Sequence, residues 1–422
     1  MRKTFLFVTF ILFCLIPLFA AEVQPVDLVY TNPGENCAES MRIAFHSTES
    51  SAVLYWTKAS DADFKKAHKI KLSGTADTAD FHEHEHFYKF GAELKKLSPD
   101  TEYIYKIKLL DGYESPVYSF KTAGNDGVFG FLWVSDVHTH PMYPNRLALA
   151  EQIAEYAEEQ LDGDMYLSVV SGDDVCYGAF YDHWQQWQGT FLNRSVWALT
   201  PGNHNYYDIL EPSGKAIMNM QWFEATQNQP KNGPAEQLTT FWFLYDTVLF
   251  LAVDCVEESY SVQQKKWMAK VIEENEGRYQ YIIVYEHYPY MSAYTGGFSG
   301  GAAQYFLWQN IFDDYGVDVA LSGDSHVYLE TKRVYNKHLG KDDKGTVYIG
   351  APQVGERGRD VTNNLNEELM ENRISCSELA DGSGMSYFKV TREGLTHVLI
   401  DASGAVRAET FIPARRPYPV KK

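Results

Sequence analysis

Hydrophobic and polar positions follow two different rhythms along the chain. Up to about residue 122, short β-branched and aromatic runs such as MRIAFHS, AVLYWTK and EYIYKIKLL are separated by turn signals rich in Pro, Gly and Asp. Strands at this spacing predict an all-β sandwich over residues 22–123.

One run, FHEHEHF, places His82, His84 and His86 on one face of a strand. These three could form a metal patch, but we expect surface histidines on an ordinary strand of the sandwich.

After a short linker, residues 127–413 alternate apolar runs with amphipathic stretches. The predicted helices cover residues 145–160, 261–276 and 302–315. Such alternation indicates an α/β domain with buried strands, and the strands after residue 345 are expected to complete its sheets. The aromatic run YDHWQQWQGTFLN either forms a wall facing a substrate or, as we expect, a helix that packs through Trp184, Trp187 and Phe191.

The two ends of the chain differ from both domains. Two basic residues precede the apolar run Phe5–Phe19 and the pair Ala20-Ala21, which is the pattern of a cleaved signal peptide over residues 1–21. The protein is therefore expected to be secreted or periplasmic, with no stable membrane insertion after cleavage; an uncleaved anchor is the alternative. The basic tail, residues 414–422, is expected to fray.

Composition narrows the range of partners. The chain has 422 residues, of which 45% are hydrophobic and 15% aromatic, as in globular proteins. Its formal net charge of −19 argues against nucleic acid as a bulk partner and against anionic membrane surfaces. An anionic ligand would therefore need local cations at its binding site. The sequence does not indicate an oligomeric state.

Four of the five cysteines remain after the signal peptide, namely Cys37, Cys176, Cys255 and Cys376. Their spacing contains no CxxC motif and no zinc-binding pattern. In an exported protein they could form disulfides, and in a large core they could equally remain buried thiols. Both alternatives stay open.

Five apolar runs end in the same kind of polar residue. The runs GFLWVSDVHTH, MYLSVVSGDD, SVWALTPGNHN, YIIVYEHYPY and VALSGDSH carry Asp136, His138, Asp173, Asn203, His204, His287, Asp324 and His326 at their ends. Ligands of open α/β sheets bind at the carboxyl ends of strands, so these side chains are expected to converge. Crowded carboxylates repel one another unless cations neutralise them, and mixed oxygen and nitrogen donors suit Zn, Mn, Fe or Mg. A single Asp or His at a strand end is commonly a cap or a surface residue, but five such ends in order predict a metal site.

The order of these motifs, D-x-H, G-D, G-N-H, H and G-x-x-H, resembles the calcineurin-like metallophosphoesterase superfamily. This resemblance implies an α/β fold with a four-layer α/β/β/α metallophosphoesterase sandwich. The stretches ESMRIAFHSTESSAVLYW and LKKLSPDTEYIYKIKLLDGYESPVYSFKT, together with GTVYIGAP after the last motif, are similar to purple acid phosphatases. In that subfamily a fibronectin III-like sandwich precedes the catalytic domain.

The resemblance also implies a cofactor and a reaction. Two metal ions, drawn from Fe, Mn, Zn and Mg, would bind side by side, and a metal-bridged hydroxide would attack a phosphate monoester. The resemblance assigns Asp136, His138 and His326 to the first ion, Asn203 and His287 to the second, and Asp173 to a bridging position. Asn203 and His204 would bind substrate, and His204 would stabilise the transition state or protonate the leaving oxygen.

Three positions depart from the family pattern. Asp324 stands where the family has the first histidine of its last motif; it either coordinates the second ion, as we expect, or is too short to reach it. Where purple acid phosphatases have a tyrosine ligand the chain has Cys176, with Tyr177 one residue late, so we expect His138 to replace that ligand and no purple tyrosinate–iron complex. Gly296-Gly297 takes the place of a histidine pair that contacts substrate, so substrate recognition must differ.

The sequence leaves three functions open. The first is an exported metal-dependent phosphomonoesterase. The second, a phosphodiesterase acting on nucleotides or lipid head groups, shares the same motifs. The third is a non-catalytic surface binding protein whose second metal site was lost through Asp324, although the retained Asp173, Asn203 and His204 favour catalysis.

Overall fold

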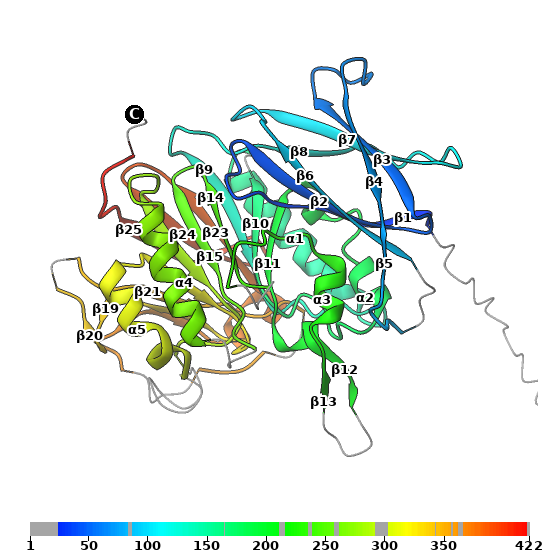
Figure 1. Cartoon of the computed structure of the whole chain (residues 1–422). Coiled ribbons are helices and arrows are strands. Elements are labelled where there is room, and N and C mark those ends of the chain that lie inside the picture. The colour runs from blue at the N-terminus through cyan, green and yellow to red at the C-terminus, as the bar shows by residue number, and fades with distance from the viewer. Residues whose placement is uncertain are drawn as a thin grey trace, which may run out of the picture.

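The computed structural model describes residues 24–82, 87–163, 165–210, 216–234, 239–256, 261–291, 303–341, 343–355, 358–361 and 366–419. The expected signal peptide, His84 and His86, and Gly296-Gly297 lie outside the described residues. Figure 1 shows a smaller β domain against one side of a larger α/β domain. Within the described residues, no helix combines the length and the apolar character needed to cross a membrane.

The N-terminal domain is the predicted all-β sandwich, built from two four-stranded sheets. One sheet contains β1 (Val26–Pro33), β2 (Ser40–Ser47), β6 (Tyr88–Lys95) and β5 (Thr75–Ala76), and the other contains β4 (His68–Ser73), β3 (Ser51–Lys58), β7 (Glu102–Leu109) and β8 (Tyr118–Lys121). Alternate residues of β7, from Tyr103 to Leu109, are buried. This period of two is that of a strand with one face on a core.

The FHEHEHF segment does not form the expected ordinary strand in its described part. His82 makes only an isolated bridge to Phe180 of the second domain, and its side chain pairs with Asp208. Phe81 and Phe87 are buried on either side. The apolar residues of this segment therefore turn into the interface between the domains, and His82 is a contact residue of that interface.

The second domain contains two mixed sheets. The six-stranded sheet has the order β11 (Val196–Thr200), β10 (Met165–Ser171), β9 (Phe129–Val134), β23 (Gly384–Val390), β24 (Gly394–Asp401) and β25 (Val406–Pro413). The seven-stranded sheet has the order β14 (Phe241–Tyr245), β15 (Val248–Ala252), β16 (Tyr281–Tyr285), β17 (Val319–Ser322), β21 (Val347–Gly350), β18 (Tyr328–Thr331) and β22 (Met370–Ile374). Short hairpins pair β12 (Tyr207–Leu210) with β13 (Ala216–Met218) and β19 (Val334–Tyr335) with β20 (His338–Leu339). The strands after residue 345 complete both sheets, as predicted.

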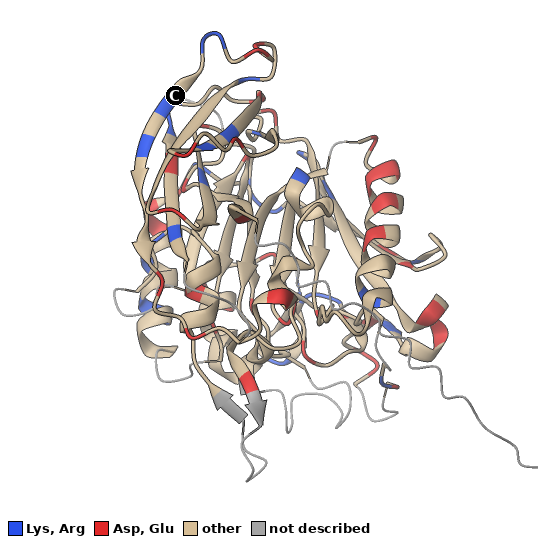
Figure 2. Ribbon diagram, turned by 90° about the vertical axis from the view of Figure 1, so that its right-hand side faces the viewer, with Lys and Arg blue, Asp and Glu red and all other residues tan. Residues whose placement is uncertain are grey.

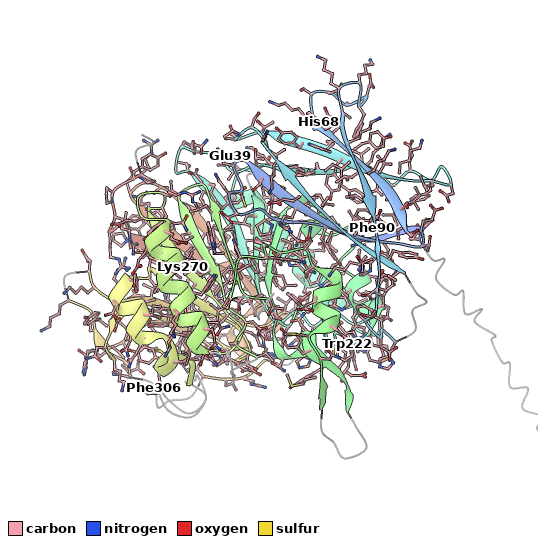
Figure 3. The ribbon with its side chains drawn as sticks, in the orientation of Figure 1. Glu39, His68, Phe90, Trp222, Lys270 and Phe306 are labelled. Carbon is pink, nitrogen blue, oxygen red and sulfur yellow. The ribbon has the colours of Figure 1, made fainter. Side chains whose placement is uncertain are left out.

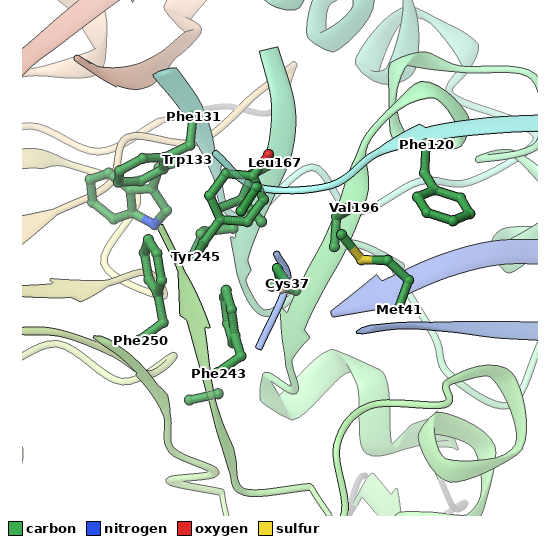
Figure 4. Packing of buried hydrophobic residues seen from close by; sticks show 14 of the residues in the cluster. Cys37, Met41, Phe120, Phe131, Trp133, Leu167, Val196, Phe243, Tyr245 and Phe250 are labelled. Atoms are coloured by element: carbon green, nitrogen blue, oxygen red, sulfur yellow. The ribbon is translucent and has the colours of Figure 1, made fainter. Parts of the chain in front are cut away.

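Helices cover the outer faces of the two sheets and give the predicted four layers (Figure 1). They are α1 (Pro144–Gln160), α2 (Tyr181–Gln185), α3 (Gln221–Thr226), α4 (Ser261–Glu274) and α5 (Ala303–Tyr315), and α1, α4 and α5 confirm the three predicted helices. Along β9, Phe131 and Trp133 face the core between the sheets, whereas Leu132 and Val134 face the helical layer. Phe131 meets Phe250 of the facing sheet with ring centroids 5.4 Å apart (Figure 4). Because strand side chains alternate between faces, both faces of β9 must be apolar.

The aromatic run at residues 181–193 is not one continuous helix. α2 ends at Gln185, the backbone turns at Gly189 with φ of 79°, and a 3-10 helix spans Phe191–Arg194. A positive φ ends a helix, and glycine adopts it without steric cost. The expected packing role is nevertheless confirmed, because Trp184, Trp187 and Phe191 are almost fully buried.

The C-terminal tail does not fray within its described residues. Arg415 Nε lies 3.0 Å from one oxygen of the buried Asp318 carboxylate, and Arg416 Nη1 lies 2.6 Å from the other. Arg415 also donates to the carbonyl of Val317. A buried carboxylate without counter-charge is costly, so Asp318 anchors the tail. The expectation of fraying overlooked this long-range requirement.

The four cysteines beyond residue 24 are free thiols in the described structure. Cys37, Cys255 and Cys376 are buried and Cys176 is half-buried. Of the two alternatives left by the sequence, the structure therefore adopts the unpaired one.

Polar side chains fix the N-terminal domain on the second domain. Asn32 of β1 donates to the carbonyl of Trp197 at 3.0 Å and accepts the backbone N–H of Asn228 at 2.9 Å. Trp222 of α3, labelled in Figure 3, donates its indole N–H to the carbonyl of Asp80 at 3.1 Å. Buried polar groups must be paired, so these bonds define one relative orientation of the domains.

A buried acid links the two central sheets. Glu330 of β18 accepts hydrogen bonds from Thr410 of β25 at 2.9 Å and Asn372 of β22 at 2.7 Å. It also faces His397 Nδ1 of β24 at 3.3 Å, and neither side chain is exposed. Burial alone would raise the pKa of Glu330, but the charge and hydrogen bond of His397 outweigh burial and lower that pKa to about 2.

We predict that Glu330→Gln lowers stability in a pH-dependent way. A carboxylate whose folded pKa lies about 2 units below its unfolded value stabilises by about 3 kcal/mol above pH 5, and the contribution disappears as the pH falls toward 2. The free energy of unfolding of the variant should thus lie about 3 kcal/mol below wild type at pH 7, and the gap should narrow at pH 3. Urea unfolding of wild type and Glu330→Gln at both pH values measures this difference in the free energy of unfolding. Glu409→Gln, on the exposed side of β25, is the control; a gap that is equal at both pH values would refute the charged pair.

Candidate metal centre

Five strands from two sheets deliver polar side chains to one place. β9, β10 and β11 belong to the six-stranded sheet, and β16 and β17 belong to the seven-stranded sheet. The side chains that follow their carboxyl ends are Asp136, His138, Asp173, Asn203, His204, His287, Asp324 and His326. The parallel strands of each sheet end on the same side, so residues up to 188 positions apart in sequence meet.

The first group of donors consists of Asp136, His138 and His326. Nε2 of His326 lies 3.2 Å from Oδ1 of Asp136 and 3.3 Å from Nε2 of His138. All three donor atoms fall within 4.8 Å of one another. Two imidazole nitrogens and one carboxylate oxygen at this spacing form a donor set suited to a transition-metal ion.

The second group shares a carboxylate with the first. Nε2 of His287 lies 3.1 Å from Oδ2 of Asp173 and 3.1 Å from Oδ1 of Asn203. The same Asp173 oxygen is 3.9 Å from Nε2 of His138. Asp136, Asp173 and His287 also lie within 4.8 Å of one another. Asp173 Oδ2 therefore stands between the two groups.

Hydrogen bonds outside the donor sets fix the orientation of the donors. Nδ1 of His287 is 2.8 Å from the carbonyl of Ser171, so this nitrogen carries the proton and Nε2 faces the centre. Oδ1 of Asp173 accepts the backbone N–H of His204 at 2.8 Å, which leaves Oδ2 for the centre. Asp136 accepts the hydroxyl of Ser135 at 2.6 Å.

Asn205 supports the centre, and the sequence reading did not single it out. Its Oδ1 accepts the backbone N–H groups of Asp173 at 3.0 Å and Gly202 at 2.8 Å, and its Nδ2 donates to Asp174 at 2.6 Å. Asn205 and Asp174 are completely buried. The adjacent G-N-H motif was the available signal, but only the fold shows that the next residue joins two loops.

Two glycines of the motifs are required by close approach. A Cβ on Gly202 would lie 2.3 Å from Oδ1 of Asp173, and a Cβ on Gly323 would lie 2.1 Å from Oγ of Ser135. Any side chain at either position would displace the residues that hold the carboxylates.

The backbone of the centre is strained. Asp136, His138, Asp173, Asp324 and His326 all have φ between 49° and 58°. Non-glycine residues rarely adopt this left-handed conformation, and it persists where the surroundings impose it. Such outliers concentrate at functional sites, so their coincidence with the donor sets supports a functional centre.

Charge and burial oppose each other among the donors. Burial would raise the pKa of Asp173, but the charges of His287 and His204 outweigh it and hold that pKa well below its usual range. Burial likewise opposes protonation of His287, yet Asp173 raises its pKa to about 10. For His138 burial prevails and lowers the pKa to about 3, so its ring is neutral and offers a lone pair. The carboxylates thus favour positively charged groups, such as protonated histidines or metal ions, at the centre.

Asp324 stands back from the donor groups. Its Oδ1 lies 4.0 Å from Nε2 of His287, and its side chain is 38% exposed, whereas that of His287 is not exposed at all. Its backbone N–H donates to Asp136 at 3.1 Å. The side chain faces the centre from the solvent side, and burial raises its pKa.

His204 lies beside the donors with one nitrogen already engaged. Its Nδ1 is 2.6 Å from the carbonyl of Cys176, and its ring centroid is 4.4 Å from that of His138. Burial lowers its pKa, but Asp173 and the bond to Cys176 outweigh burial and raise it to about 9. One of its nitrogens falls within 4.8 Å of donors of His138 and Asp173. The ring centroid of Tyr177 lies 6.3 Å from that of His204.

Comparison with known proteins matches both domains. Residues 24–122 match the family "Purple acid Phosphatase, N-terminal domain", and residues 129–328 match the family "Calcineurin-like phosphoesterase". The chain is 25% identical to "Fe(3+)-Zn(2+) purple acid phosphatase 12" of Arabidopsis thaliana over 68% of this chain and 60% of that protein. It is 23% identical to "Purple acid phosphatase 1" of Ipomoea batatas over 86% of this chain and 77% of that protein. The chain thus spans less than two thirds of the Arabidopsis relative.

Solved structures share the fold. The purple acid phosphatase PPD1 of yellow lupin superposes with a TM-score of 0.68 over 92% of this chain and 74% of that one, at 16% identity. The structure of PhoD superposes with a TM-score of 0.62 over 92% of this chain and 90% of that one, at 13% identity. The fold, the ordered motifs and both family matches agree, and the chain therefore belongs to the calcineurin-like phosphoesterases and carries the N-terminal domain of the purple acid phosphatases.

Proposed function

We propose that this protein is an exported, metal-dependent hydrolase that cleaves phosphate monoesters at a centre for two metal ions. The observation that carries the proposal is the position of Asp173 Oδ2, which lies 3.1 Å from His287 Nε2 and 3.9 Å from His138 Nε2. One carboxylate oxygen between two donor groups is what a shared, bridging ligand requires. Two bound cations would supply Lewis acidity to the phosphoryl group and make a water molecule acidic near neutral pH.

Each donor group has a distinct role in this proposal. Asp136, His138 and His326 would hold one ion, and Asn203 and His287 would hold the other. Asp324 would complete the second group, because a carboxylate is a competent ligand for all four candidate metals. His138 takes the place of the tyrosine ligand of purple acid phosphatases, so no tyrosinate colour is expected.

The remaining residues act on the substrate. His204 would donate a proton to the leaving oxygen, and the amide of Asn203 would help to position the phosphoryl group. The chain has a formal net charge of −19, and in Figure 2 Asp and Glu recur along helical turns on one side, whereas Lys and Arg are scattered. A phosphate ester would therefore be attracted by the cations of the centre and by His204. The signal-like residues 1–21 support export.

The experiment compares two esters across metals. The mature protein is loaded with Mn, Fe, Zn or Mg in turn, its metal content is measured, and p-nitrophenyl phosphate and bis(p-nitrophenyl) phosphate are assayed. We expect about two ions per chain and a kcat/KM for the monoester at least about tenfold above that for the diester. A higher kcat/KM for the diester would show that the protein is a phosphodiesterase and would refute the proposed monoesterase activity. No turnover of either ester with any metal would leave only a binding role.

A substitution at Asp324 tests the second ion. We predict that Asp324→His raises zinc affinity of the second site by about tenfold, because imidazole is the better zinc ligand and reaches further than the carboxylate. Zinc titration followed by calorimetry measures the affinity directly. Asp63→His, at an exposed position of the N-terminal domain, controls for adventitious binding to a new histidine. Equal zinc affinity in wild type and Asp324→His would show that this position does not reach the second ion.

A further inference from the structure

Two tyrosine rings lie beside His204. The ring centroid of Tyr207 is 5.0 Å from that of His204, and the ring of Tyr177 is 6.3 Å from it. Phe180 extends the row, with its ring 5.8 Å from Tyr177. All three residues are half-buried. We call Tyr177, Phe180 and Tyr207 the aromatic wall.

Backbone hydrogen bonds join the segments that carry the aromatic wall. Gly178 donates its N–H to the carbonyl of His204 at 2.9 Å, and Ala179 donates to the carbonyl of Tyr207 at 3.1 Å. The loop after β10 and the loop after β11 are therefore bonded to each other beside His204. These bonds hold the backbone from which the rings project, and a pre-organised backbone lowers the entropic cost of binding a ligand.

The N-terminal domain completes this arrangement. The backbone N–H of His82 donates to the carbonyl of Ala179 at 2.8 Å, and its Nε2 lies 2.5 Å from the Asp208 carboxylate. The imidazole of His82 also packs on Phe180, with ring centroids 4.7 Å apart. His82 thus contacts both the loop that carries Tyr177 and Phe180 and the strand β12 that carries Tyr207.

We infer that the aromatic wall is the subsite for the leaving group, and that it selects phosphate monoesters of flat aromatic alcohols. The inference rests on the proposed function, because it places the leaving oxygen next to His204. Aromatic rings prefer one another in offset or edge-to-face contact at centroid distances of about 4.5–7 Å, and His204 already meets Tyr207 and Tyr177 at such distances. A flat ring attached to the leaving oxygen would extend this row of rings, whereas a saturated group would lose the aromatic contacts. His82 is a positioning residue of the subsite.

The test measures binding without turnover. Phenylphosphonate and cyclohexylphosphonate carry the same anionic group and differ in whether the ring is flat and aromatic. Calorimetric titration of the metal-loaded protein should give a dissociation constant about 3 to 10 times lower for phenylphosphonate. Tyr207→Leu and Tyr177→Leu should each bring this ratio close to one, whereas Tyr207→Phe, which keeps the ring, should preserve it. Tyr335→Leu, at an exposed tyrosine of the β19–β20 hairpin, is the matched control and should preserve it too.

His82 is tested through the same ratio. His82→Ala should reduce the preference for phenylphosphonate, and His82→Gln, which retains a donor for Asp208, should restore it. A purely structural role for His82 would lower the melting temperature without changing the ratio, and that result would overturn the positioning role.

The inference and the proposed function fail in different ways. If inorganic phosphate and both phosphonates do not bind the metal-loaded protein, the proposed function itself is wrong. If they bind with a ratio close to one in the wild type, or with a ratio unchanged by Tyr207→Leu and Tyr177→Leu, the proposed function survives and the aromatic subsite is refuted.

Discussion

Replacing Asp173 by Asn is expected to reduce kcat/KM for p-nitrophenyl phosphate by at least about 1,000-fold, because the bridging carboxylate that we propose would supply several kcal/mol of charge stabilisation. The metal content should fall below two ions per chain. The variant keeps the shape of the side chain and an acceptor oxygen for the His204 N–H, which is 2.8 Å from Oδ1 in the native protein. It removes the negative charge that faces His287 and His138 from 3.1 and 3.9 Å.

The matched control for this prediction is Asp162→Asn. Asp162 has nearly the same left-handed backbone, with φ of 54° against 52° for Asp173, but it is exposed and lies outside the centre. The control therefore shows how much an Asp→Asn change at a left-handed backbone position affects the protein apart from the metal centre. Full turnover and two ions per chain in Asp173→Asn would rule out a bridging carboxylate at this position.

The fold and the donor groups could be predicted because their signals are local. The apolar run of β9 shows that both of its faces are buried, and the polar residues Asp136 and His138 that follow it show where the strand ends. Parallel strands bring such ends together without further information. The same reasoning located Asp173, Asn203 and His287.

Interactions between distant residues could not be predicted from the same patterns. His82 and Asp208 are 126 positions apart, and Arg416 and Asp318 are 98 apart. Periodicity describes which face of an element is buried and says nothing about which charged residue from elsewhere will satisfy a buried group. The sequence patterns therefore predicted that the histidine-rich segment and the basic tail are exposed to solvent. In the structure, His82 pairs with the half-buried Asp208, and Arg416 pairs with the buried Asp318.

The distance of Asp324 from the centre illustrates a second limit. The sequence predicts Asp324 as a ligand of the second ion, and the reach of its carboxylate depends on the backbone conformation, which residue types do not specify. Asp324 has φ of 58° and donates its own N–H to Asp136, which places its carboxylate on the exposed side. Shifts of about one ångström in the position of a ligand atom decide whether it coordinates a metal ion. A pattern of residue types does not encode such shifts.

Replacing His204 by Gln is expected to lower kcat by about 100- to 10,000-fold for esters of poor leaving groups, because proton transfer contributes that much when the leaving oxygen needs it. The loss should be smaller for p-nitrophenyl phosphate, whose leaving group departs as a stable anion. β-Glycerophosphate, with an alkoxide leaving group, should show the full loss. The ratio of the two losses therefore reports protonation directly.

Metal analysis of the same variant separates two roles for His204. Its imidazole lies within 4.8 Å of donors of His138 and Asp173, so a role as a metal ligand is geometrically available. A ligand role predicts loss of metal and an equal loss of kcat for both esters. A proton donor predicts unchanged metal content and an unequal loss, which is the result we expect from the role proposed for His204. Because Nδ1 is engaged with the carbonyl of Cys176 at 2.6 Å, Nε2 is the nitrogen that would act in either role. His338→Gln, at an exposed histidine of β20, should change neither quantity.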